Sequence, residues 1–91
     1  MKSKQCTTKQ KVEMAIKIML RAVEISEITP HEVFVRYAPH VDYIDVDIHI
    51  GGWERNKTPI HLQVPLSDRH EAGEHFNTLM AEFDLLMGAV K

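Results

Sequence analysis

The chain has 91 residues, which is enough for one domain and too few for a second hydrophobic core. Apolar and charged residues make up 44% and 26% of it, the proportions of a globular protein, which argues against an intrinsically disordered chain. The formal net charge of −2 argues against a protein whose main partner is the phosphate backbone of a nucleic acid.

The first predicted element is an amphipathic helix that follows a polar segment. Residues 1–6 show no apolar periodicity, and we predict a flexible N-terminal tail followed by a single domain over residues 7–91. Thr7 and Gln10 have the spacing of a capping box, in which each side chain satisfies a free backbone N–H group at the start of a helix. The apolar periodicity then continues to about Glu27.

This first helix is apolar over a wide arc. Its charged residues form one narrow stripe, whereas its apolar residues cover roughly two-thirds of the circumference at about 100° per residue. These apolar residues are Val12, Met14, Ala15, Ile16, Ile18, Met19, Leu20, Ala22, Val23 and Ile25. Because one sheet face cannot cover so wide a surface, we expect the helix to contact a second helix, a partner chain or both.

Three β-strands are predicted after this helix. Residues 32–37 are rich in β-branched and aromatic side chains, and residues 38–41 are typical of a four-residue turn. Residues 43–50 alternate strictly between apolar and polar side chains, which makes this the clearest strand of the chain. A third alternating segment lies between Pro59 and Pro65, and flanking prolines suit an edge strand.

A second amphipathic helix follows, capped by Ser67 or Asp68. Its apolar residues lie on one face and are Ala72, Phe76, Leu79, Met80, Phe83, Leu86, Met87 and Val90. The order α-β-β-β-α predicts an α+β fold, a two-layer sandwich in which a three-stranded antiparallel meander carries both helices on one face. The polar face of the sheet would then meet water or a partner.

Four side chains on that polar face form a candidate metal site. Asp45, Asp47 and His49 alternate along one strand and therefore point the same way, and His61 is expected beside them on the neighbouring strand. Carboxylate and imidazole groups are suitable ligands for a divalent metal such as zinc or manganese. The alternative is a solvated face on which Arg36 neutralises a carboxylate across the hairpin. Convergence of the four ligands on one point would favour the metal site, and neutralisation would favour the solvated face.

The start of the second helix is rich in histidine but lacks a catalytic spacing. His70 and His75 are five residues apart, whereas the zinc-protease helix needs two histidines four residues apart on one face. No serine or cysteine has an evident base beside it in the predicted fold. The sequence therefore favours a protein that is not an enzyme and that needs no cofactor.

The first turn and the strand after it carry a family resemblance. Pro39, His40 and the alternating residues 44–51 are similar to the loop and second strand of the double-stranded RNA-binding domain, whose element order is also α-β-β-β-α. That family has glycine where Ala38 stands, and its second helix opens with phosphate-binding lysines, whereas residues 67–71 include two acids. The resemblance implies a fold of this kind with weak or lost nucleic-acid binding.

The wide apolar arc of the first helix and several large side chains favour a protein interface. Aromatic residues and methionine are common at interface centres. The candidate interface residues are Met14, Ile18, Ile25, Tyr37 and Trp53. We therefore expect a protein-interaction or accessory module that acts as a homodimer, through its first helix or the edge of its first strand. The alternatives are a metal-binding protein or metal-dependent enzyme that uses the polar sheet face, and an RNA-binding-like fold.

Cysteine content and hydropathy favour a cytoplasmic protein. Cys6 is the only cysteine, so no intrachain disulfide can form and folding needs no oxidising compartment. The apolar stretch over residues 14–25 carries Lys17, Arg21 and Glu24, which argues against both a membrane span and a signal peptide. We expect no membrane partner.

Overall fold

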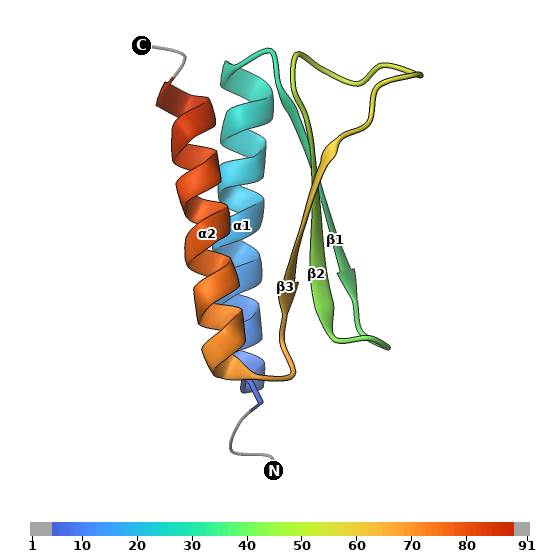
Figure 1. Ribbon diagram of the computed structural model, residues 1–91. Helices are drawn as coiled ribbons and strands as arrows, with labels where there is room; N and C mark the ends of the chain where they lie inside the picture. The colour runs from blue at the N-terminus through green and yellow to red at the C-terminus, as the bar shows by residue number, and fades with distance from the viewer. Residues whose placement is uncertain (1–4, 89–91) are drawn as a thin grey trace.

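The computed structural model describes residues 5–88, which form two helices and a three-stranded sheet (Figure 1). In chain order the elements are α1 (Thr8–Ile28), β1 (Glu32–Ala38), β2 (Tyr43–His49), β3 (Ile60–Pro65) and α2 (Arg69–Gly88). Both helices lie on one side of the sheet, where α1 contacts β1, α2 contacts β3, and the helices contact each other (Figure 1). The predicted α+β fold and its α-β-β-β-α order are confirmed.

Side-chain hydrogen bonds define both ends of α1. At its start, Gln10 N–H donates to Thr7 Oγ1 at 3.1 Å and Thr7 N–H donates to Gln10 Oε1 at 2.8 Å, which is the predicted capping box. At its end, the backbone N–H and the hydroxyl of Thr29 both donate to the Ile25 carbonyl oxygen, at 2.9 and 2.7 Å. Thr29 Oγ1 also accepts the His31 N–H at 3.0 Å, so one buried side chain ends α1 and begins the turn into β1.

The sheet is an antiparallel meander in the order β1-β2-β3, so β1 and β3 are its edge strands. On the side that faces the helices, Val46 in the centre lies opposite Val35 of β1 and Leu62 of β3. Residues 39–42 join β1 to β2, one residue later than predicted, because Ala38 still pairs with the first residue of β2. The predicted alternation of the central strand therefore holds across both of its neighbours.

The loop between β1 and β2 is attached to α1. Asp42 has a positive φ of 59°, a conformation that aspartate tolerates better than most residues. Its carboxylate pairs with Lys11 Nζ at 2.9 Å, and this hydrogen bond raises the pKa of Lys11. Its carbonyl oxygen accepts the Leu66 N–H at 2.8 Å, which joins the loop to the chain leaving β3.

The hydrophobic core lies between the sheet and the two helices. Its largest fully buried side chains are Ile18, Ile25, Ile44, Val46, Ile48, Val64, Leu66, Leu79 and Phe83. Cys6, which the sequence placed in the flexible tail, is also buried, and its N–H donates to the Leu66 carbonyl oxygen at 3.2 Å. Burial raises the pKa of the Cys6 thiol. Residues 1–4 of the predicted tail and Val90 of the predicted helix lie outside the described residues.

Candidate functional site

The face of the sheet away from the helices carries a buried carboxylate. Asp45 lies on the central strand and is only 8% exposed, because its neighbours on both edge strands cover it. Gln63 Nε2 donates to Asp45 Oδ1 at 3.0 Å from β3, and Arg36 lies 3.6 Å from Asp45 Oδ2 on β1. The pairing of Arg36 with Asp45 matches the register of the two strands. This is the neutralised arrangement that favours a solvated or partner-binding face over a metal site.

The four predicted metal ligands are only partly brought together. His61 lies beside two of them, with Nδ1 2.5 Å from Asp47 Oδ1 and Nε2 3.5 Å from Asp45 Oδ1. His49 is buried and its ring packs edge-on against Phe34, with ring centroids 5.1 Å apart. Within residues 5–88, no group of three or more His, Cys, Asp and Glu side chains has the geometry to hold a metal ion. Metal binding at this face remains a hypothesis without a preformed centre.

The histidines of α2 do not form a site with each other. His70 Nε2 lies 3.6 Å from Glu74 Oε2 at the surface, an exposed i,i+4 pair. Asp68 Oδ1 accepts the N–H groups of His70 and Glu71, and so caps the helix as one of the two predicted residues. His75 instead lines a shallow hollow of about 270 Å³ that also borders β3.

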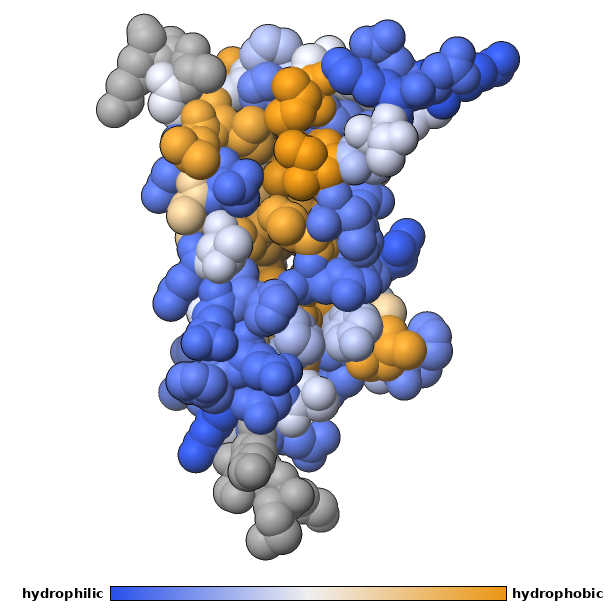
Figure 2. Space-filling view, in the orientation of Figure 1, coloured by the Kyte–Doolittle hydropathy of each residue, from blue (hydrophilic) through white to orange (hydrophobic). Residues whose placement is uncertain are grey.

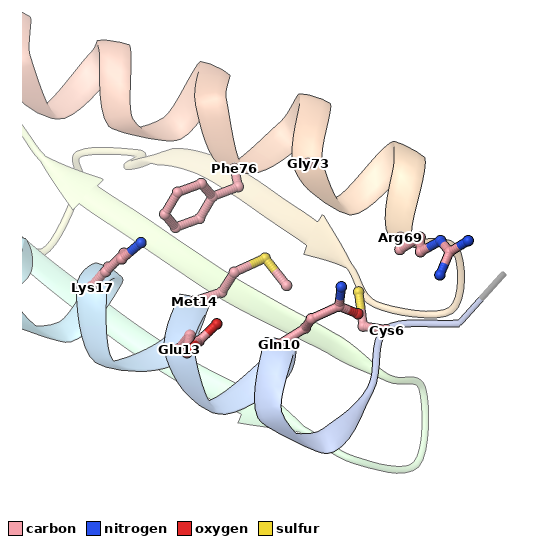
Figure 3. Close-up of a pocket in the computed structure, with 8 residues that line it drawn as sticks. All are labelled: Cys6, Gln10, Glu13, Met14, Lys17, Arg69, Gly73 and Phe76. Carbon is pink, nitrogen blue, oxygen red and sulfur yellow. The ribbon is translucent and has the colours of Figure 1, made fainter. Parts of the chain in front are cut away.

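A second hollow lies between the N-terminal halves of the two helices (Figure 3). Its volume is about 200 Å³, and Met14 of α1 and Phe76 of α2 point toward each other across it. Cys6 lies near one end, and the charged side chains of Lys17 and Arg69 lie toward opposite ends. Met14, one of the predicted interface residues, therefore belongs to the contact between α1 and α2.

The most apolar exposed surface runs along α1. We define the α1 outer face as five large apolar side chains that are each about half exposed and lie within one arc of about 100°: Val12 (50%), Ile16 (59%), Met19 (48%), Leu20 (58%) and Val23 (53%). Ile28 (55%), the last residue of α1, is also exposed but lies about 80° around the helix beyond Leu20. Arg21 shows which way this face points, because its guanidinium reaches α2 and pairs with Asp84 at 2.8 Å. Met19 and Val23 lie two residues to either side of Arg21, about 160° around the helix from it. The α1 outer face therefore points away from α2.

The other four predicted interface residues fall into two groups. Ile18 and Ile25 are fully buried beneath α1 and are core residues, so they cannot contact a partner in this fold. Tyr37 and Trp53 are exposed at 52% and 60%. The width of the apolar arc on the first helix indicates that one layer cannot cover it, but no local pattern shows which part of the arc faces the core. The five side chains of the α1 outer face were missed for this reason.

The opposite side of the molecule exposes less apolar surface of this kind. Figure 2 shows apolar atoms at the surface along the seam between α2 and β3, where partly buried apolar side chains of both elements pack against the core. Among the described residues of these two elements, only Ile60 (42%) and Leu85 (71%) are large apolar side chains that are exposed. The α1 outer face is therefore the strongest candidate for an interaction surface.

Comparison with family models, with curated proteins and with solved structures found no match to this chain. Neither helix, over the residues that the structure describes, combines the length and the hydropathy needed to cross a membrane.

Proposed function

We propose that this protein is a non-enzymatic interaction module of the cytoplasm that forms a homodimer through the α1 outer face. One observation carries the proposal: five large apolar side chains lie together on one helix, each about half exposed, and point away from the rest of the fold. Contiguous exposed apolar surface of this kind is typical of protein–protein contacts, whereas single exposed apolar residues are ordinary. The chain's single cysteine is compatible with a reducing compartment.

The exposed area is large enough to contribute substantially to association. Burial of a large apolar side chain contributes about 2.5 kcal/mol, and each Å² of buried apolar surface contributes about 25 cal/mol. A fully exposed side chain of this kind therefore presents roughly 100 Å². Five half-exposed side chains on each of two copies would then bury roughly 500 Å² of apolar surface. A standard interface buries about 1,200–2,000 Å² in total, of which somewhat more than half is apolar. The α1 outer face supplies much of the apolar part, and flanking residues must supply the remainder.

The experiment is to measure molecular mass by sedimentation equilibrium from micromolar to submillimolar protein. We expect the wild-type chain to shift from monomer to dimer over this range. Ile16→Glu places a charge near the middle of the α1 outer face, and dimerisation would bury two such charges without partners. The variant should therefore dimerise at least about 100-fold more weakly, which corresponds to a cost of about 1.4 kcal/mol for each of the two buried charges.

Leu85→Glu is the matched control. It makes the same kind of apolar-to-acid change at the most exposed large apolar side chain of the described residues, which lies on α2 rather than α1. This variant should dimerise like the wild type, and circular dichroism should show both variants folded. A wild-type chain that stays monomeric at submillimolar concentration would refute the proposal, as would equal weakening by both substitutions.

Metal binding is the second candidate function, because His61 lies between two carboxylates. Its two ring nitrogens are 2.5 Å from Asp47 and 3.5 Å from Asp45. Such a site would need Arg36 and Gln63 to release Asp45 before its oxygens could bind a cation. We therefore rank this function below self-association.

A further inference from the structure

The charges of α1 are arranged against its own helix dipole. The first turn contains Lys9 and Lys11 and no acid, and the last turn contains Glu27 and no base. Cations at a helix N-terminus and anions at its C-terminus each interact unfavourably with the helix dipole. Lys11 is compensated by its ion pair with Asp42. Lys9 and Glu27 are exposed and have no ion pair with any residue over 5–88.

Lys9 and Glu27 also lie on the same edge of the helix. They are 18 residues apart, which is about five full turns at 3.6 residues per turn. Both side chains project in the same direction from the helix axis, about 60° around the helix from Val12 and about 40° from Val23. This direction faces away from the sheet. The two charges therefore flank the α1 outer face at its two ends.

The apolar positions of this surface are symmetric along the helix. Each has an apolar counterpart at the same distance on the other side of a point midway between Lys17 and Ile18. The symmetric pairs are Val12 with Val23, Ala15 with Leu20, and Ile16 with Met19. In an antiparallel pair whose two-fold axis lies between the two helices at the level of this point, each of these positions meets an apolar position of the second copy, as a self-complementary interface requires.

We propose that two copies pair with their α1 helices antiparallel about this axis, so that Val12 of one copy packs against Val23 of the other. This inference rests on the proposed function and specifies its geometry. In the antiparallel arrangement, Lys9 of one copy and Glu27 of the other lie at nearly the same level along the helix axis. Their levels differ by less than about 2 Å, because the two positions are only one residue away from exact symmetry about the midpoint. Each charge then lies beside an opposite charge and beside the helix end of favourable sign.

The neighbouring edge strand completes the interface. Tyr37 of β1 is 52% exposed and lines the same hollow as Val12 and Ala15, so it borders the α1 outer face. Two half-exposed tyrosines would add roughly 200 Å² at about 150–250 Å² for each whole aromatic side chain. The buried apolar area then totals roughly 700 Å². The smallest standard interfaces bury about 1,200 Å², of which about 60% is apolar, so the two areas agree.

Disulfide cross-linking tests the geometry. Val12→Cys and Val23→Cys are prepared separately, one of them ¹⁵N-labelled, then mixed and oxidised, and the masses of the cross-linked species are measured. The antiparallel pair predicts the mixed disulfide as the main product. It predicts little Val12→Cys homodimer, because the two Val12 positions would be about 16 Å apart along the axis, far beyond disulfide reach. The wild type, whose Cys6 is buried, is the control and should not cross-link.

The outcomes separate this inference from the proposed function. A wild-type monomer in sedimentation refutes both. A wild-type dimer whose Val12→Cys variant cross-links to itself shows a different register and refutes only the antiparallel pairing. As a second readout, Lys9→Glu and Glu27→Lys should each weaken dimerisation roughly tenfold, and the double variant should restore it. Failure of the double variant to recover would contradict the contact between these two charges.

Discussion

The link between α1 and β1 depends on one buried hydroxyl, and removing it should destabilise the fold measurably. Thr29→Val keeps the shape of the side chain but loses both of its hydrogen bonds, the donation to Ile25 at 2.7 Å and the acceptance from His31 at 3.0 Å. The Ile25 carbonyl oxygen still accepts the Thr29 N–H at 2.9 Å, so losing the hydroxyl as a second donor costs this oxygen little. The His31 N–H loses its partner in a partly buried position, which costs about 1–3 kcal/mol.

We expect a total loss of about 2 kcal/mol, measured by thermal unfolding at one fixed protein concentration because dimerisation raises the apparent stability. For a domain of this size the melting temperature should fall by roughly 8–16 °C. Thr29→Ser is the matched control, because it keeps the hydroxyl and loses only one methyl group, worth about 0.8 kcal/mol. If Thr29→Val unfolds within about 0.5 kcal/mol of the wild type, or Thr29→Ser is equally destabilised, the assigned role of the hydroxyl is wrong.

Three further predictions concern the core, the alkaline range and the polar sheet face. Phe83→Ala should lower the free energy of unfolding by about 3–5 kcal/mol in urea titrations, because the side chain is fully buried; a loss below about 1 kcal/mol would contradict that packing. Burial raises the pKa of Cys6, and the hydrogen bond between Lys11 and Asp42 raises the pKa of Lys11. Each shift favours the folded state at pH values below the pKa that the group has in the unfolded chain. Stability should therefore fall as pH rises from roughly 8.5 to beyond 10.4, whereas a flat urea midpoint over that range would refute the linkage. Calorimetric titration with zinc should show no tight binding at the polar sheet face, so the wild type and the Asp47→Ala, His61→Ala double variant should give the same result. Stoichiometric binding that these substitutions abolish would restore the metal hypothesis.

The sheet was the most predictable part of the fold. The strict alternation of residues 43–50 assigned one face of β2 to the core, because side chains on a strand point to opposite sides in turn. The capping box at Thr7 and Gln10 is likewise a local pattern, and the structure contains both of its hydrogen bonds. The end of the first turn was misplaced by one residue because Ala38, before a proline, can still pair in an edge strand.

The polar face of the sheet could be predicted only in part. Period-two alternation correctly placed Asp45, Asp47 and His61 near one another, since it follows from strand geometry alone. Whether those side chains converge on an empty point or satisfy each other depends on rotamers and on the register of three strands. The structure shows Gln63 and Arg36 beside Asp45, an arrangement that no local pattern specifies.

The sequence by itself determined the order of the elements, the face of each strand that is buried and the excess of apolar surface on the first helix, because these depend on periodicity along a short segment. Only the tertiary structure decided how that surface is divided. The positions of β1 and α2 bury Ile18 and Ile25 and leave Ile16 and Leu20 exposed, although all four are equally apolar in the sequence. Burial of a helix face depends on which distant segments pack against it, and that information is not local.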